Sequence, residues 1–303
     1  MTKTPLLSTL RAAFGDRLQE DVPLAGYTAA RIGGNADALL VASSAEELAQ
    51  TVSRLWEMEI PFLLLGGGSN LLISDAGYRG VVLLNKAKKV RFVEGKSPRV
   101  RVESGVMISK LANRAAARSL AGLEWASTVP GTIGGAVYGN AGAFHGDMAG
   151  NLHHAELLTR SGRETWNVDA MEYGYRNSKL KRHAVEAVVL SAELTLKNGE
   201  QAEIRERMRS FIKIRKVTQP SGASMGSMFK NPEGDFAGRL IENAGLKGTR
   251  IGNAEISAVH ANFIVNHGET KASDVIALVE LAQQKVLEEF GVALELEIEI
   301  VGE

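Results

Sequence analysis

The feature that most constrains the fold is a pair of glycine-rich segments. The first, LLLGGGSNLL, contains an apolar run that ends abruptly at Gly66, Gly67 and Gly68. The second, STVPGTIGGAVYGNAGAFHG, covers residues 127–146 and contains few bulky side chains. Because glycine lacks a Cβ atom, its backbone can approach a ligand closely, at a cost in conformational entropy. Both segments therefore predict loops that lie against a bound molecule.

The first segment has the donors that an anionic diphosphate needs. Successive backbone N–H groups form an anion cradle, and Ser69 and Asn70 add a hydroxyl and an amide. The alternative for this segment is a tight turn between two strands, and for the second segment it is an ordinary flexible loop. Neither segment matches G-x-G-x-x-G or G-x-x-x-x-G-K-[ST], so the sequence supports neither a Rossmann nor a Walker site.

The remaining patterns predict a mixed α and β chain. A capping-box pattern at Ser44–Glu47 opens a helix that should reach about Met58, and Ser161-Gly162 predicts a tight turn between strands. Residues 271–290 form a strongly periodic helix that should end before Gly291, and the tail LELEIEIVG predicts one alternating strand. Further helices are expected at 107–120, 203–215 and 236–244, and further strands at 38–41, 61–65, 71–73, 81–84, 100–103, 185–196 and 262–265.

Composition limits the possible partners. The 303 residues are 45% hydrophobic and 23% charged, which is ordinary for a globular protein of two or three domains. Lysine and arginine number 35, as do aspartate and glutamate, so we expect a small-molecule partner and no nucleic acid. The chain has no cysteine, and the sequence contains no signal peptide and no apolar stretch of about 18 residues. We therefore expect a cytoplasmic protein without membrane insertion.

Two catalytic patterns overlap in SGASMGSMFKNP, residues 221–232. Ser224 lies in a formal G-x-S-x-G, and Ser227 and Lys230 form a formal S-x-x-K. The first pattern would make a serine hydrolase only if a strand ran into Ser224 and a helix followed it, and the preceding VTQPSGA is unsuited to such a strand. A hydrolase that uses Ser224 or Ser227 is thus one alternative function. A nucleotide-binding or flavin-binding module without catalytic activity is another.

Several motifs together resemble one family. In chain order they are GGGSN, VPGTIGGAVYGNAGAFHG, YGYRNSKLK, GSMFKNP, AGRLIENAGLKG and HANFIVN. Their order and spacing are similar to those of the UDP-N-acetylenolpyruvoylglucosamine reductases, flavoenzymes that make UDP-N-acetylmuramate for peptidoglycan. The resemblance extends over nearly the whole chain, from Thr28 to Gly302.

The resemblance implies an α+β fold with a FAD-binding region of the vanillyl-alcohol-oxidase type. Two α+β subdomains, residues 1–84 and 85–217, would bind FAD, and an α/β domain, residues 218–303, would bind the substrate and return its last strand to the active site. The implied reductant is NADPH, the implied substrate is the enolpyruvyl ether of UDP-N-acetylglucosamine, and we expect a monomer. The residues implied to bind FAD are Gly66, Gly67, Gly68, Ser69, Asn70, Val129, Pro130, Gly131, Gly134, Gly135, Asn140, Ala141 and Gly142.

The resemblance also implies three catalytic residues, which are Arg176, Ser227 and Glu297. Arg176 would grip the substrate carboxylate, Glu297 would bond an enolate oxygen, and Ser227 would donate a proton to C2. In the implied reaction NADPH reduces the flavin, whose N5 then gives a hydride to C3 of the substrate. The implied substrate ligands are Tyr175, Lys230 and Asn231.

Other polar residues receive weaker interpretations. Asn262 and Asn266 are either ligands or strand-end caps. The histidines, including the pair His153-His154, lack metal-ligand spacing, so the sequence predicts no metal site. Glu299 departs from the family pattern, which often has arginine there, and it places an extra acidic group near Glu297.

Overall fold

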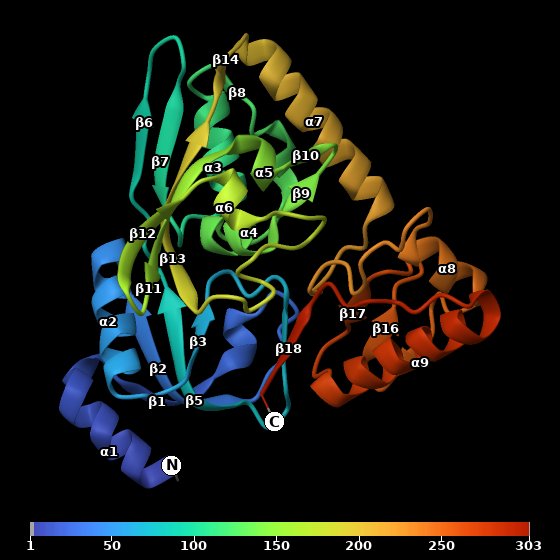
Figure 1. Cartoon of the computed structure of the whole chain (residues 1–303). Coiled ribbons are helices and arrows are strands. Elements are labelled where there is room, and N and C mark those ends of the chain that lie inside the picture. The colour runs from blue at the N-terminus through green and yellow to red at the C-terminus, as the bar shows by residue number, and fades with distance from the viewer. Residues whose placement is uncertain (1–2, 303) are drawn as a thin grey trace. The chain divides into compact units, whose positions relative to one another are not determined.

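The computed structural model describes residues 3–302 (Figure 1). Two compact units divide the chain. Unit 1 comprises Met1–Leu39, Gly68–Val82 and Arg215–Glu303, and unit 2 comprises Leu40–Gly67 and Leu83–Ile214. None of the described helices is long and apolar enough to cross a membrane.

Unit 1 contains the N-terminal and C-terminal elements. They are α1 (Lys3–Phe14), η1 (Gly15–Arg17), β1 (Gln19–Pro23), η2 (Leu24–Tyr27), β4 (Leu71–Ile73), α8 (Ala237–Asn243), β15 (Arg250–Ile251), β16 (Ala254–Ile256), β17 (Ile264–Asn266), α9 (Ala272–Phe290) and β18 (Glu299–Val301). Strands β15, β16 and β17 form an antiparallel sheet against which α9 packs. In α9, Val275, Leu278, Val279, Ala282 and Val286 are buried as their spacing predicts. The same spacing predicts Phe290 on this face, but Phe290 lies on the last turn and is exposed.

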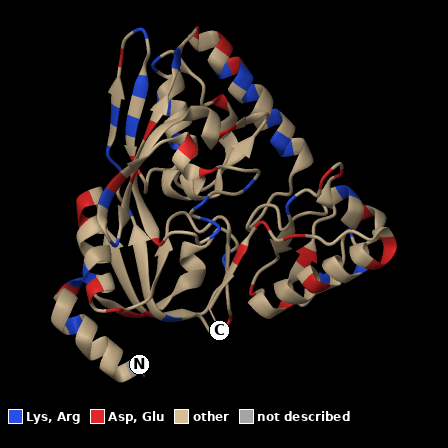
Figure 2. Cartoon of the chain, viewed as in Figure 1, with Lys and Arg blue, Asp and Glu red and all other residues tan. Residues whose placement is uncertain are grey.

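Unit 2 contains α2 (Ala45–Glu57), β3 (Phe62–Leu65), β6 (Val90–Val93), β7 (Arg99–Glu103), α3 (Ile108–Ala116), β8 (Leu120–Ala121), η3 (Glu124–Thr128), α4 (Ile133–Gly139), β9 (Gly142–Ala143), β10 (Gly146–Asp147), α5 (Met148–Asn151), β11 (Leu152–Thr159), β12 (Gly162–Trp166), α6 (Val168–Met171), β13 (Ala187–Thr195), β14 (Lys197–Asn198) and most of α7 (Gln201–Thr218). It is built on a five-stranded antiparallel sheet in the order β12-β11-β13-β7-β6. Helix α4 packs on β13 and β7, and α3 and α4 contribute to the buried core with Leu157, Ala192 and Leu194 of the sheet. The long helix α7 carries interspersed basic and acidic residues (Figure 2).

A second sheet has the order β1-β2-β5-β3, where β2 is Asn35–Ala42 and β5 is Tyr78–Asn85. The division between the units passes through β2 and β5. The predicted helix after β2 is present as α2, and the Ser44 hydroxyl accepts a hydrogen bond from the Glu47 N–H at its start. The mixed helix and strand content confirms the predicted α+β class. The three predicted domains, with boundaries after residues 84 and 217, stay a prediction.

One predicted element is wrong in extent. The tail was expected to be a single alternating strand, but residues 297 and 298 form a bend and β18 begins only at Glu299. Leu296 makes an isolated antiparallel bridge with Phe229, whereas β18 pairs in parallel with β4. The chain therefore changes its pairing partner at this bend. This change also breaks the expected alternation of Glu295, Glu297 and Glu299 on one face.

Candidate functional site

The first glycine segment contacts the second within unit 2. A Cβ atom on Gly67 would lie 2.9 Å from Cα of Gly131, and one on Gly66 would lie 2.5 Å from the Thr132 hydroxyl. Both positions consequently exclude a side chain, and the two segments form one surface of bare backbone. A cradle of this kind suits a pyrophosphate, which needs N–H donors and close approach.

Gly68 and Asn70 lie in unit 1, and the structure shows what each contacts there. Gly68 has φ +57°, and its carbonyl accepts a hydrogen bond of 2.9 Å from the Ala29 N–H. The side-chain amide of Asn70 donates to the Glu297 carbonyl at 3.1 Å, and the Asn70 carbonyl accepts from the Glu299 N–H at 3.0 Å. Asn70 thus holds the bend that carries Glu297.

The second glycine segment is held by the β7–α3 connection. The N–H groups of Ile133 and Gly134 donate to the carbonyls of Val106 and Ser104, at 2.9 and 2.8 Å. The first residue of this segment is Ser127, whose buried hydroxyl has no hydrogen-bond partner among residues 3–302. Since buried hydroxyls normally have partners, this one is available to a ligand of the segment. The residues present therefore fit a bound cofactor.

Arg176 lies at the tip of a tight turn closed by reciprocal backbone hydrogen bonds of 3.1 and 3.2 Å between Gly174 and Asn177. Its φ is +52°, a conformation that non-glycine residues adopt rarely and that is frequently found at functional sites. The guanidinium donates to the Gly142 carbonyl at 2.7 Å and lies 5.2 Å from the ring centre of Tyr175, whose side chain is exposed. The sequence-predicted residues Arg176, Tyr175 and Gly142 are thus neighbours.

Two residues that sequence reasoning missed hold this turn against α4. The Tyr173 hydroxyl donates to the Val137 carbonyl at 2.8 Å, and the Ser178 hydroxyl donates to the Tyr138 carbonyl at 2.5 Å. Burial raises the pKa of Tyr173 well above its usual value, so its hydroxyl keeps the donated proton. Both residues lie within YGYRNSKLK, where their positions beside Arg176 were the available signal.

Asn140, a predicted FAD ligand, joins the same assembly. It has a left-handed φ of +46° at the end of α4. Its amide donates to the Gly174 carbonyl at 3.0 Å and accepts from the Ala149 N–H at 3.0 Å. The side chain therefore connects the glycine segment to the Arg176 turn.

The segments that carry Ser227 and Glu297 are paired through their backbones within unit 1. The Glu297 N–H donates to the Met228 carbonyl at 2.8 Å, and the Lys230 N–H donates to the Glu295 carbonyl at 2.9 Å. Ser227 itself forms an antiparallel bridge with Phe263, on the other side of the segment. The segment that carries Ser227 consequently lies between the HANFIVN segment and the chain that carries Glu297, and both side chains are partly buried.

The buried residue Asn262 clamps this segment. Its amide oxygen accepts from the Phe229 N–H at 2.9 Å, and its amide nitrogen donates to the Phe229 carbonyl at 2.8 Å. Its backbone carbonyl accepts from the Met228 N–H at 2.9 Å. The sequence predicts Asn262 as either a ligand or a strand-end cap, and these hydrogen bonds favour a structural role. The bonds act on Phe229, two residues from Ser227.

The remaining predicted substrate ligands have protein partners. The Lys230 ammonium pairs with Glu295 at 2.8 Å, and the Asn231 amide oxygen accepts from the Ala237 N–H at the start of α8, at 3.1 Å. Ser224 lies in irregular chain, with no strand running into it and no helix directly after it. The local structure therefore lacks the elbow that a hydrolase of the G-x-S-x-G type requires.

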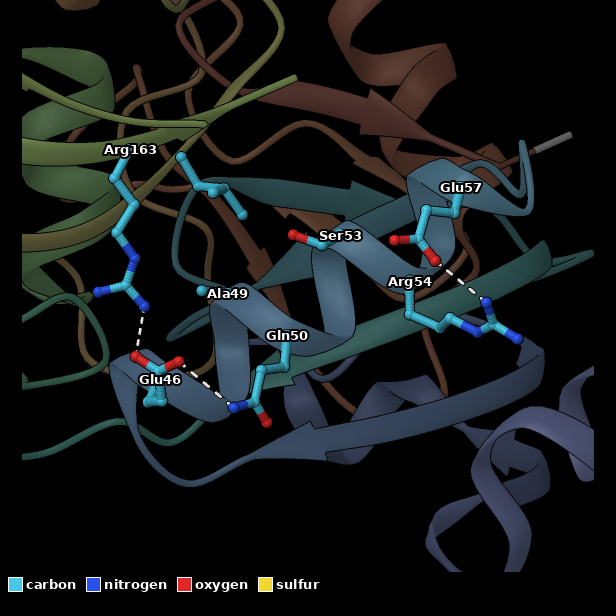
Figure 3. Close-up of a pocket in the computed structure, with 8 residues that line it drawn as sticks. Glu46, Ala49, Gln50, Ser53, Arg54, Glu57 and Arg163 are labelled. Carbon is cyan, nitrogen blue, oxygen red and sulfur yellow. Dashed lines mark hydrogen bonds and ion pairs between the residues drawn. The ribbon is translucent and has the colours of Figure 1, made fainter. Parts of the chain in front are cut away.

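A groove of about 420 Å³ lies between α2 and the β11–β12 hairpin (Figure 3). Its polar lining includes two ion pairs, Arg163 with Glu46 and Arg54 with Glu57. None of its lining residues belongs to the glycine segments or to the predicted catalytic set. The chemistry predicted from the sequence is therefore not located there.

Comparisons with known proteins identify the family. Residues 218–301 match the model of the UDP-N-acetylenolpyruvoylglucosamine reductase C-terminal domain. UDP-N-acetylenolpyruvoylglucosamine reductase of Chloroflexus aurantiacus is 41% identical over 94% of this chain and 97% of the relative, and that of Rubrobacter xylanophilus is 45% identical over 93% and 95%. The chain belongs to the UDP-N-acetylenolpyruvoylglucosamine reductase family.

Two further comparisons concern the fold. Residues 36–166 match a model described as a FAD binding domain, so the reductase family member carries a flavin-binding region. The crystal structure of UDP-N-acetylenolpyruvylglucosamine reductase from Thermus caldophilus superposes with a TM-score of 0.80 at 36% identity, over 94% of this chain and 99% of that one. The predicted family and fold class are confirmed. The FAD-binding match includes both Gly66–Gly67 and Gly131–Thr132, the residues that form the bare backbone surface.

Proposed function

We propose that this chain reduces the enolpyruvyl ether of UDP-N-acetylglucosamine to UDP-N-acetylmuramate, with FAD as cofactor and NADPH as reductant, for peptidoglycan synthesis. The observation that carries the proposal is the pairing of the Ser227 segment with the Glu297 segment, marked by the 2.8 Å bond from Glu297 N–H to the Met228 carbonyl. It places an acidic group and a hydroxyl on adjoining segments. The names and high coverage of the relatives support the same activity.

FAD would be held by the two glycine segments. We assign its pyrophosphate to Gly66–Asn70, where side chains are excluded, and its remaining length to residues 129–142. The unpartnered Ser127 hydroxyl adds a donor or acceptor at the start of the second segment. When bound, FAD supplies the hydride that the reduction requires.

The residues of the chain would stabilise the negative charge that develops on the substrate and donate the proton that the reduction requires. Addition of a hydride at C3 of the substrate moves an electron pair through C2 onto the carboxylate, so this carboxylate gains enolate character. The guanidinium group of Arg176 is planar and permanently charged, and its N–H groups can bind both oxygens of a carboxylate. We therefore assign Arg176 to the substrate carboxylate. Glu297, in its protonated form, would donate a hydrogen bond to an enolate oxygen.

Ser227 would complete the reaction as an acid. A serine hydroxyl is a weak acid in water, but an enolate carbon is a strong base, and a positioned donor raises the rate of proton transfer. Lys230 lies three residues away and adds positive charge that favours the alkoxide left on Ser227, although its ammonium also pairs with Glu295 at 2.8 Å. We place the enzyme in the cytoplasm, where NADPH and UDP-sugars are made, and we propose that it acts as a monomer.

The test uses the flavin absorbance of the purified holoenzyme under anaerobic conditions. NADPH should bleach the yellow protein, and the enolpyruvyl UDP-sugar should restore the colour with formation of UDP-N-acetylmuramate. A colourless protein that cleaves ester reporters would establish the hydrolase instead. A yellow protein that responds to neither compound would establish a binding module without catalytic activity.

A further inference from the structure

The five-stranded sheet of unit 2 brings together two histidines and a glutamate that are far apart in the sequence. Ring nitrogens of His153 and His154 and a carboxylate oxygen of Glu193 lie within 4.8 Å of one another. The histidines are adjacent on β11, and Glu193 lies on β13. The sequence shows no metal-ligand spacing around the histidines because the third residue, Glu193, is brought to them by strand pairing.

A β-bulge explains how adjacent histidines share one face. In a regular strand, successive side chains point to opposite faces. Here Leu152 pairs with Leu194 and His154 pairs with Glu193, so β11 has one more residue than β13, and this residue is His153. A bulge redirects a side chain in this way. The two imidazole rings consequently lie 5.1 Å apart, and His154 is directly opposite Glu193.

The cluster already holds a cationic group, the guanidinium of Arg99. A guanidinium nitrogen of Arg99 lies 2.9 Å from His153 Nε2 and 3.1 Å from a Glu193 oxygen. The other nearby arginine, Arg101, pairs with Glu156. The Arg99 side chain is 38% exposed, so it has solvent into which it can move. A metal ion would take the place of this guanidinium.

We propose that His153, His154 and Glu193 form a zinc site that Arg99 occupies when no metal is bound. Two imidazoles and one carboxylate form a set that suits zinc, and a water molecule would complete its four ligands. The proposal does not depend on the reductase activity.

The experiment titrates the FAD-loaded protein with Zn²⁺ alone by calorimetry and with Co²⁺ by its visible absorption beyond the flavin bands. One ion should bind per chain with saturation. His154→Ala and Glu193→Gln should each weaken binding at least as much as the ~10–100-fold that loss of a supporting partner costs. Arg99→Ala should instead tighten binding, by roughly tenfold, because the competing cation is removed.

The matched control is His267→Ala, which removes a histidine paired with Glu255 at 3.0 Å in unit 1. It should bind Zn²⁺ as the unmodified protein does. Absence of saturable binding by the unmodified protein would overturn the proposal, even if Arg99→Ala bound the metal. Equal binding by the unmodified protein and both ligand variants would also overturn it. Flavin content and circular dichroism of each variant identify any loss of folding, and Glu193→Gln is the least disruptive of the set.

Discussion

A side chain at position 67 has no room, because its Cβ atom would lie 2.9 Å from Cα of Gly131. Gly67→Asp would also place a negative charge where we assign the FAD pyrophosphate. We expect this variant to fold but to purify without flavin, as measured by the ratio of visible to ultraviolet absorbance. Gly26→Ala is the control, since a Cβ there meets nothing within 4 Å and the residue lies outside the segments assigned to FAD. Full flavin content in Gly67→Asp would place the pyrophosphate elsewhere.

Arg176 combines a strained φ of +52° with a charged planar group, and lysine cannot reproduce its two-pronged contact. Arg176→Lys should slow reoxidation by the enolpyruvyl substrate far more than it slows reduction by NADPH. Stopped-flow absorbance separates the two rates. Arg182→Lys is the matched control, because Arg182 lies in the same segment and pairs with Glu172 at 2.7 Å. Equal slowing of both steps in Arg176→Lys would remove its assigned role.

At the scale of elements, the segment that carries Ser227 lies outside the named helices and strands. Isolated bridges to Phe263 and Leu296 hold it, and the Asn262 side chain adds two further hydrogen bonds. Asn262→Ala would leave the buried N–H and carbonyl of Phe229 without their side-chain partners, at a cost of about 1–3 kcal/mol in the free energy of unfolding. It should also slow substrate-dependent reoxidation, while flavin content stays normal.

Asn198→Ala is the comparison for this variant, because it removes one exposed amide-to-carbonyl bond. Urea unfolding and stopped-flow absorbance measure the two effects. If Asn262→Ala loses stability but reoxidises at the normal rate, the clamp is structural and does not position Ser227.

Helix α9 begins against a carboxylate from a distant loop. Asp75 accepts hydrogen bonds from the N–H groups of Ala272 and Ser273, at 2.7 and 3.0 Å. Burial alone would raise the pKa of Asp75, but these bonds outweigh it and lower the pKa below its ordinary value of 3.8. Asp75→Ala should therefore destabilise the protein by about 0.5–2 kcal/mol at neutral pH, as loss of a helix cap does.

The pH dependence of this effect has a definite sign. A lowered folded-state pKa gives stability that is fully present above 3.8 and is lost as pH falls through the lower folded value. The difference in unfolding free energy between Asp75→Ala and the unmodified protein should thus shrink at acidic pH. The exposed Glu94, changed to alanine, should show little effect at any pH. A difference for Asp75→Ala that grows on acidification would contradict the assignment.

Local patterns predicted much of the fold because short-range physics determines them. The capped start of α2 and the buried face of α9 both depend on residues within a few turns of one another. The turn predicted at Ser161-Gly162 is present one residue earlier, at Arg160-Ser161, because Gly162 already pairs with Thr159 as the first residue of β12. The bend at Glu297 could not be predicted, because it arises from pairing with two segments distant in sequence. The same reason applies to the Asn262 clamp and to the grouping of Glu193 with the two histidines.

For the molecule as a whole, the predicted chemistry is distributed over both units. Unit 2 contains the Arg176 turn and most of the bare backbone assigned to FAD, whereas unit 1 contains Ser227 and Glu297. The sequence motifs identified these residues through a family resemblance. The contacts of the structure add what positions them, which includes Tyr173, Ser178, Asn70 and Asn262. The central claim is that Ser227 is the proton donor in the reduction.

Rapid-mixing absorbance of the flavin in Ser227→Ala tests this claim most directly, because it records the two halves of the reaction separately. The variant should bind FAD and be reduced by NADPH at a near-normal rate, since that half involves no substrate proton. Reoxidation by the enolpyruvyl substrate should fall by ~10²–10⁴, the usual contribution of a positioned general acid. Ser227→Cys should recover part of the loss, and Ser224→Ala should leave both halves nearly unchanged. Normal reoxidation in Ser227→Ala, with the loss found in Ser224→Ala instead, would contradict the account.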